Sequence, residues 1–145
     1  MRKIEYIFID SDCQCKPDRH VPPNFGYHFV VNREGLVLTT TDISIPMQRI
    51  PGPIYDRDKF NNCSICIRYC GSLRPEAWLI DADTNCSDIL RQRAALLQLL
   101  VKLRKHFPDA KILGVSELDG KELDAKNIIV SDSMNVLRRE LSDLP

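Results

Sequence analysis

The amino-acid sequence predicts an α/β fold, with a central mixed β-sheet flanked by helices. Short runs of β-branched and aromatic residues recur, as in YIFID (6–10) and CSICIRYCG (63–71), and such side chains favour strands. Two other segments, 87–109 and 131–144, have apolar residues at helical spacing. Strands mixed with amphipathic helices are typical of a sheet with helices packed on it.

Length and charge limit the possible classes of protein. The chain has 145 residues, enough for one compact core, and we expect a single domain over residues 1–145. Twenty basic and twenty acidic residues cancel, so the charge does not indicate a nucleic-acid partner. No uninterrupted apolar run approaches about 18 residues, so we expect no membrane partner. MRKIEYIFID does not resemble a secretory signal, and we expect a cytoplasmic protein with six reduced cysteines.

The amino-terminal half is expected to supply a strand and a hairpin. The first strand should run from about Ile4 to Asp10, where the apolar residues give way to polar ones. The segments 27–31 (YHFVV) and 36–40 (LVLTT) flank NREG, whose asparagine and glycine are good turn residues. The hairpin is therefore predicted over residues 27–40.

The middle of the chain is expected to form a loop and a buried strand. Residues 42–62 contain several prolines and are predicted to lie on the surface as an irregular loop. Cys63, Cys66 and Cys70 in the following strand form a C-x2-C-x3-C pattern. Because side chains alternate between the faces of a strand, Cys66 and Cys70 would share a face and Cys63 would point away. We therefore interpret these thiols as core residues and not as metal ligands.

The carboxyl-terminal half is expected to supply two helices and a further strand. Ser87 can cap the longer helix and Pro108 ends it. Residues 110–118 (AKILGVSEL) should form a strand, and the second helix should begin at Ser131 or Asp132. The longer helix has two apolar rows, namely Leu90, Ala94, Leu97 and Val101, and Leu96, Leu100, Leu103 and Phe107.

Few residues suggest chemistry by themselves. Asp10 ends a predicted strand, where it is open to interpretation as a metal ligand, a general base or a polar strand end. His28 lies in the predicted hairpin, and a lone histidine there is more often a hydrogen-bonded packing residue than a ligand. No phosphate-binding loop, dinucleotide fingerprint or nucleophile elbow is present in the sequence.

The order of several segments resembles a known family. FGYHFVVNREGLV (25–37) resembles the G-Y-H-[FY]-x-[IV]-x-R-[DE]-G-x-[IV] hairpin of the zinc-dependent N-acetylmuramoyl-L-alanine amidases, which include phage T7-type lysozyme and the peptidoglycan recognition proteins. NNCSICIRYCGSL (61–73) is similar to their N-x-x-S-I-G-I-x-x-x-G-G strand, and residues 89–114 are similar to their long helix and next strand. The resemblance implies an N-acetylmuramoyl-L-alanine amidase-like α/β fold, with peptidoglycan as the class of ligand.

The resemblance also implies that the zinc site is degenerate. The three positions of the family's zinc ligands fall on Asp10, Val115 and Ile128. Valine and isoleucine donate no lone pair, and a hydrolytic zinc needs three protein donors and a water. We therefore expect no metal and no zinc cofactor. The positions of two catalytic helpers keep the family's residue types, as Tyr27 and Lys126.

These expectations lead to a hypothesis and two alternatives. The leading hypothesis is a catalytically inactive binding or regulatory module, whose partner is a peptidoglycan fragment or a protein, with a remnant cleft around Asp10, Tyr27, His28 and Lys126. One alternative is an active peptidoglycan amide hydrolase with a rebuilt metal site. The other is a partner-binding protein with no glycan ligand. The rebuilt site would draw on the polar residues Asp10, Asp12, Cys13, Cys15, Ser116, Glu117 and Asp119.

A missing segment supports the first hypothesis. The family has a helix between its first strand and its hairpin, and this helix walls the substrate groove. Here the interval holds only SDCQCKPDRHVPPNF (11–25), which is too short and too rich in proline for a helix with two connections. We expect the groove to be reshaped.

Overall fold

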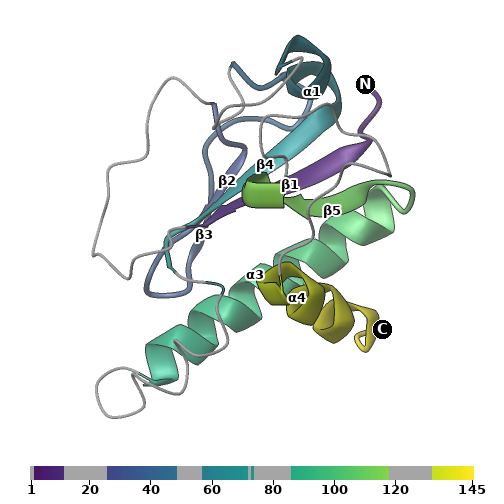
Figure 1. The fold of residues 1–145 in the computed structure, drawn as a ribbon. Helices are drawn as coiled ribbons and strands as arrows, with labels where there is room; N and C mark the ends of the chain where they lie inside the picture. Colours follow the sequence, from purple (N-terminus) through teal and green to yellow (C-terminus); the bar gives the residue numbers. More distant parts are fainter. Residues whose placement is uncertain (1, 12–25, 49–56, 72, 74–85, 118–131) are drawn as a thin grey trace.

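The computed structural model describes residues 2–11, 26–48, 57–71, 73, 86–117 and 132–145 (Figure 1). Within these ranges the chain forms both strands and helices. The elements in chain order are β1 (Tyr6–Ser11), β2 (Phe29–Val31), β3 (Val37–Thr39), α1 (Arg57–Cys63), β4 (Ser64–Tyr69), α3 (Cys86–His106), β5 (Lys111–Gly114), the 3-10 helix η1 (Val115–Glu117) and α4 (Asp132–Ser142).

The strands form one mixed sheet in the order β3-β2-β4-β1-β5. Strand β1 lies between β4 and β5 and is parallel to both. Strand β2 is parallel to β4, whereas β3 is antiparallel to β2. The predicted mixed sheet with flanking helices is therefore confirmed. Since β1, β2, β4 and β5 run in the same direction, their carboxyl ends lie along one edge of the sheet.

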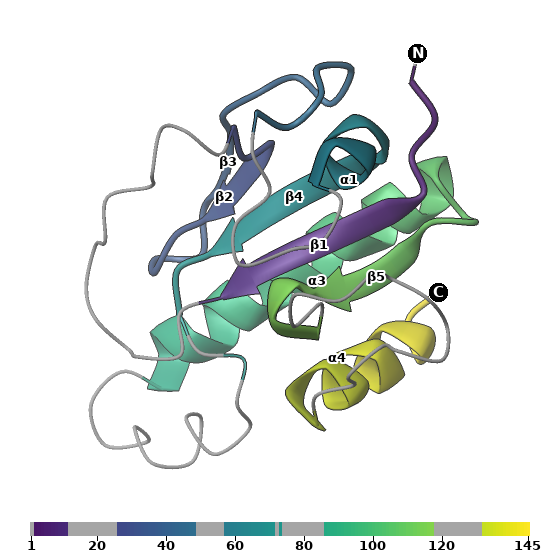
Figure 2. The same cartoon turned by 45° about the horizontal axis from the view of Figure 1, so that its top comes forward.

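One face of the sheet is covered by α3 and α4, and Figure 2 shows α3 running behind the strands. Ile7 and Ile9 of β1 point to this face because side chains alternate along a strand. The helices contribute apolar residues that are almost fully buried, and burial of each large aliphatic side chain stabilises the fold by about 1.5–3 kcal/mol. These helix residues are Leu96, Leu99, Leu100, Leu103, Met134, Leu137 and Leu141.

The opposite face carries a smaller apolar cluster. Phe8 of β1 and Cys66 of β4 are fully buried there, together with Phe60 of α1. The rings of Phe8 and Phe60 meet edge to face, with centroids 5.9 Å apart, a favourable arrangement for aromatic pairs. Tyr27, Met47 and Leu113 complete the cluster. Asp10 follows Phe8 by two residues and so lies on this same face, at the carboxyl end of β1.

The hairpin forms as the sequence predicts. Asn32 accepts a hydrogen bond from the backbone N–H of Leu36 through its side-chain oxygen, at 2.8 Å. Gly35 has a φ of 82°, a left-handed conformation that costs glycine little. A β-carbon at this position would also lie only 2.8 Å from the side chain of Arg91 of α3. The turn therefore needs glycine on two grounds.

Two segments differ from the prediction in the middle of the chain. The end of the predicted loop 42–62 is helical, because α1 begins at Arg57 and continues to Cys63. Strand β4 then begins at Ser64 and ends at Tyr69. Cys63 and Cys70 thus lie outside the strand, so the strand-face argument for them was wrong. All three cysteines of the pattern are free thiols, and Cys66 is fully buried.

The helical half contains smaller differences. Helix α3 begins at Cys86, so Ser87 lies inside its first turn, and it ends at His106 as predicted. Its row containing Leu96, Leu100 and Leu103 is buried, whereas Leu90 of the other row is 54% exposed. Strand β5 ends at Gly114, and the predicted continuation to 118 is replaced by η1. In the part of the chain that the structure describes, no helix has the length and apolar character needed to cross a membrane.

Candidate functional site

The candidate site is centred on an ion pair between neighbouring parallel strands. Asp10 of β1 is paired with Arg68 of β4 in the sheet. Nη1 of Arg68 donates to Oδ2 of Asp10 at 3.1 Å. The Arg68 side chain is only 9% exposed, whereas that of Asp10 is 19% exposed. The cation is therefore more deeply buried than the carboxylate, which lies near the carboxyl end of β1.

A tyrosine donates to the same carboxylate oxygen. The Tyr27 hydroxyl donates a hydrogen bond to Oδ2 of Asp10, and its side chain is almost fully buried. Burial, together with the negative charge and hydrogen bond of Asp10, raises the pKa of Tyr27 well above its usual value. The phenol is therefore neutral at physiological pH, with its proton directed at Asp10.

The two oxygens of the Asp10 carboxylate therefore have different contacts. Both of the donors described above reach Oδ2. Within the described residues, Oδ1 receives no hydrogen bond, and the side chain is partly exposed. Beneath it, burial raises the pKa of the Cys66 thiol well above its usual value, so this sulfur remains protonated and unreactive. Oδ1 is consequently the polar atom of this group that is left for a ligand.

His28 is held inside the protein by contacts at both ring nitrogens. Nδ1 accepts from the backbone N–H of Cys66 at 3.2 Å, and Nε2 lies 2.7 Å from the carbonyl oxygen of Ile45. The N–H of Cys66 at Nδ1 and the carbonyl of Ile45 at Nε2 favour the tautomer with the proton on Nε2, and Nη2 of Arg2 also lies 3.0 Å from Nε2. The side chain is fully buried, and this burial lowers the pKa of His28. The geometry favours the packing interpretation of this residue over a ligand contact.

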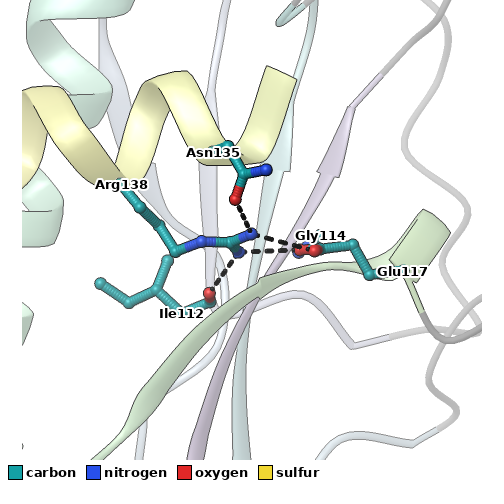
Figure 3. Close-up of polar contacts among 5 residues, drawn as sticks. All are labelled: Ile112, Gly114, Glu117, Asn135 and Arg138. Carbon is teal, nitrogen blue, oxygen red and sulfur yellow. Dashed lines mark hydrogen bonds and ion pairs between the residues drawn. The ribbon is translucent and has the colours of Figure 1, made fainter. Parts of the chain in front are cut away.

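The Glu117 carboxylate is also hydrogen-bonded to other groups of the protein, as Figure 3 shows. Its carboxylate accepts two hydrogen bonds from Arg138 of α4, at 2.9 and 3.0 Å, and one from the backbone N–H of Gly114 at 2.8 Å. Arg138 also donates to the carbonyl oxygen of Ile112 and to the side chain of Asn135. The Glu117 side chain is fully buried. This network ties η1 to α4 and occupies the carboxylate.

The predicted site residues are brought together only in part. Asp10 and Tyr27 are in contact, and Val115 packs against the cluster that contains Tyr27. Among the residues that are described, no group of three or more histidine, cysteine, aspartate or glutamate side chains could hold a metal ion. The other predicted positions lie outside the described residues, namely Lys126, Ile128 and four members of the hypothetical rebuilt site, Asp12, Cys13, Cys15 and Asp119. The side chain of Ser116, another member of that site, is also outside the described part.

Arg68 is the residue of this site that the sequence analysis missed. It stands in a segment interpreted only as a buried strand, yet it is the one charged residue of β4. A charge in a buried strand requires a partner, and this is the signal that could have pointed to Asp10. The pairing itself depends on the alignment of β1 with β4, which the sequence does not specify.

Comparisons with known proteins support the fold. No protein-family model matches the sequence, and no curated protein matches it either. Similar solved structures include two that match almost the whole chain. The Ph2119 endolysin from Thermus scotoductus MAT2119 bacteriophage Ph2119 has a TM-score of 0.52 and 21% identity, covering 95% of this chain and 84% of its own.

The second structure is N-acetylmuramoyl-L-alanine amidase LysC from Clostridium intestinale URNW. It has a TM-score of 0.56 and 12% identity, covering 97% of this chain and 87% of its own. At these identities the likeness concerns the fold. The chain therefore has the fold of these two proteins, the amidase-like five-stranded mixed sheet with flanking helices.

Proposed function

We propose that this chain is an amidase-fold module that binds peptidoglycan fragments without hydrolysing them, and that it serves in binding or regulation. The proposal rests on the ion pair between Arg68 and Asp10. According to the family resemblance, Asp10 stands where a zinc-binding histidine is expected. Here a guanidinium already supplies the positive charge at that carboxylate.

The donors at this position do not fit zinc. A metal at Asp10 would have to compete with the two hydrogen bonds that Oδ2 accepts from Arg68 and Tyr27. It would also lie beside a buried cation. Two unit positive charges about 4 Å apart repel by about 4 kcal/mol at the effective dielectric constant of a protein surface, and the double charge of zinc raises this repulsion further. The second ligand position, Val115, supplies only an apolar side chain, which packs against the Tyr27 cluster.

Glu117, one of two carboxylates that could replace the lost histidine, already has partners in the protein. Glu117 would need to release Arg138 and the N–H of Gly114 before it could bind a metal. That release would leave the Arg138 guanidinium without its carboxylate partner, which is costly when an ion pair is buried. These contacts support the binding module over a hydrolase with a rebuilt metal site.

The family resemblance places Tyr27 at the position of a catalytic helper, and this proposal gives it a different role. Its proton is directed at Asp10, and its raised pKa means that it does not act as a general base near neutral pH. Tyr27 therefore positions the Asp10 carboxylate. Together Tyr27 and Arg68 hold Oδ2, so that the orientation of the carboxylate plane is fixed before any ligand arrives.

The test combines binding and turnover in the purified full chain. Soluble muramoyl-peptide fragments should bind, as measured by calorimetry, while mass spectrometry should detect no release of peptide after prolonged incubation with added zinc. Binding accompanied by zinc-dependent and chelator-sensitive cleavage would show an active amidase. Absence of binding to every fragment, with a stable protein complex recovered from cells, would favour the partner-binding alternative.

A further inference from the structure

The Asp10 carboxylate, whose side chain is 19% exposed, has the opposite polarity to a metal ion. A bound metal is a Lewis acid, which attracts the lone pair of a ligand oxygen. The Oδ1 atom of Asp10 instead offers lone pairs and attracts a hydrogen-bond donor. Because Arg68 and Tyr27 both donate to Oδ2, within the described residues Oδ1 keeps its accepting capacity.

The charges of Arg68 and Asp10 indicate which kind of hydrogen-bond donor on a ligand fits this site. Arg68 compensates the charge of Asp10, and it does so from within the protein, where it is 9% exposed. A cationic ligand at Oδ1 would gain attraction from the carboxylate but would also be repelled by the guanidinium. An uncharged N–H or O–H group avoids that repulsion and loses less hydration on binding.

We infer that Oδ1 of Asp10 is a recognition atom that accepts a hydrogen bond from an uncharged donor of the ligand, either a secondary amide N–H or a sugar hydroxyl. The inference rests on the proposed function, since a peptidoglycan fragment carries both kinds of donor. According to this inference, Asp10 recognises the ligand by a hydrogen-bond donor. A metal at this position would instead bind a lone pair of a ligand oxygen.

The geometry of the ion pair gives this atom a defined direction. Asp10 is held through Oδ2 by two donors on different elements, Arg68 on β4 and Tyr27 before β2. Two fixed hydrogen bonds leave the side chain little rotational freedom. A ligand donor that meets Oδ1 therefore encounters an acceptor that is already oriented, and less entropy is lost on binding.

The experiment removes one donor at a time from the ligand and keeps the protein unchanged. A muramoyl-L-alanyl fragment is compared with its ester analogue, in which oxygen replaces the amide N–H, and with analogues whose sugar hydroxyls are methylated singly. At least one of these deletions should weaken binding by about tenfold or more, because hydrogen bonds to charged groups are strong. Calorimetry on the full chain provides the affinities.

The same ligands are then measured against the double variant Asp10→Leu/Arg68→Leu. This variant removes the acceptor without leaving a buried charge unpaired. The tenfold effect of the critical donor should fall to about twofold or less there, and circular dichroism should show that the fold is retained. Asp109→Asn, which removes an exposed carboxylate after α3, is the matched control and should keep the full effect.

The outcomes distinguish failure of the inference alone from failure of the proposed function. Equal losses in the wild-type chain and in the double variant would overturn the role of Oδ1 and leave the proposed function intact. The same conclusion follows if no single donor matters in the wild-type chain. A wild-type chain that binds no fragment would overturn both the inference and the proposed function. Sensitivity to the ester identifies the amide as the donor, and sensitivity to methylation identifies a hydroxyl.

Discussion

Arg68 lies directly across from Asp10 in the parallel pairing of β4 with β1, and its Nη1 atom is 3.1 Å from Oδ2 of Asp10. The relationship joins two residues that are 58 positions apart in the sequence. It provides the compensation that a mostly buried guanidinium requires. The site therefore has an internal cation at the place where the family resemblance suggests a metal.

Breaking this pair from one side should destabilise the protein. Asp10→Ala leaves the Arg68 guanidinium buried without its carboxylate and should lower the free energy of unfolding by about 3 kcal/mol. The double variant Asp10→Leu/Arg68→Leu should cost less than the sum of the two single changes to leucine. Urea denaturation of the wild-type chain, the two single leucine variants and the double variant measures the coupling. Strictly additive losses would mean that the pair contributes nothing.

The Tyr27 hydroxyl should contribute a smaller amount. Tyr27→Phe removes one hydrogen bond to a carboxylate and should lower the free energy of unfolding by about 1.5 kcal/mol. Tyr6→Phe is the matched control, since the Tyr6 hydroxyl makes no hydrogen bond within the described residues, and its effect should stay within about 0.5 kcal/mol. Equal effects of the two substitutions in urea denaturation would contradict the assigned contact.

The contact between η1 and α4 provides a third prediction. Arg138→Met removes the cation that faces the buried Glu117 carboxylate and should cost about 3 kcal/mol. Arg139→Met alters the next residue of the same helix, which is exposed, and should cost less than about 0.5 kcal/mol. Chemical denaturation of both variants makes the comparison. Similar stabilities of the two variants would contradict the network drawn in Figure 3.

His28 should make stability depend on pH. Burial is the main cause that lowers its pKa, and the nearby Arg2 acts in the same direction, while the carbonyl of Ile45 and the charge of Asp42 oppose it. The folded protein therefore resists protonation more than the unfolded chain does. The associated stability is fully present above the unfolded pKa of about 6.5 and is lost as the pH falls toward and through the lower pKa of the folded state.

This decline can be measured by urea denaturation as the pH is lowered from the slightly alkaline to the moderately acidic range. His28→Gln should flatten the profile in this window, although it should also lower stability overall because the ring accepts from Cys66. His106→Gln, at the exposed end of α3, is the matched control and should keep the decline of the wild-type protein. If the decline of stability at lower pH persists in His28→Gln, another group causes the pH dependence.

The sheet and the long helix could be predicted from the sequence because their signals are local. Repeated apolar spacing identified α3, and the asparagine and glycine of NREG identified the hairpin. Helix α1 was missed because it has seven residues and a single fully buried aromatic, Phe60, so no periodic pattern develops. Strand β5 was predicted too long because Val115 and Leu118 extend the apolar pattern beyond Gly114, where η1 begins.

The site was harder to predict from the sequence because its contacts join distant segments. Asp10 was noted as the polar end of a strand and Tyr27 from the resemblance, but neither signal indicates that Tyr27 and Arg68 both donate to Asp10. The buried position of Glu117 was equally hidden, since it depends on Arg138 from the last helix. Charged residues inside predicted strands and turns are the signal that would have prompted a search for such partners.

The central claim, that this amidase fold works without zinc, is tested most directly by a zinc titration of the full chain. After chelator treatment and dialysis, calorimetry with added zinc should show no stoichiometric binding at micromolar concentration. The variant Asp10→Ala should behave in the same way. Binding of one zinc ion per chain, lost in Asp10→Ala, would contradict the claim.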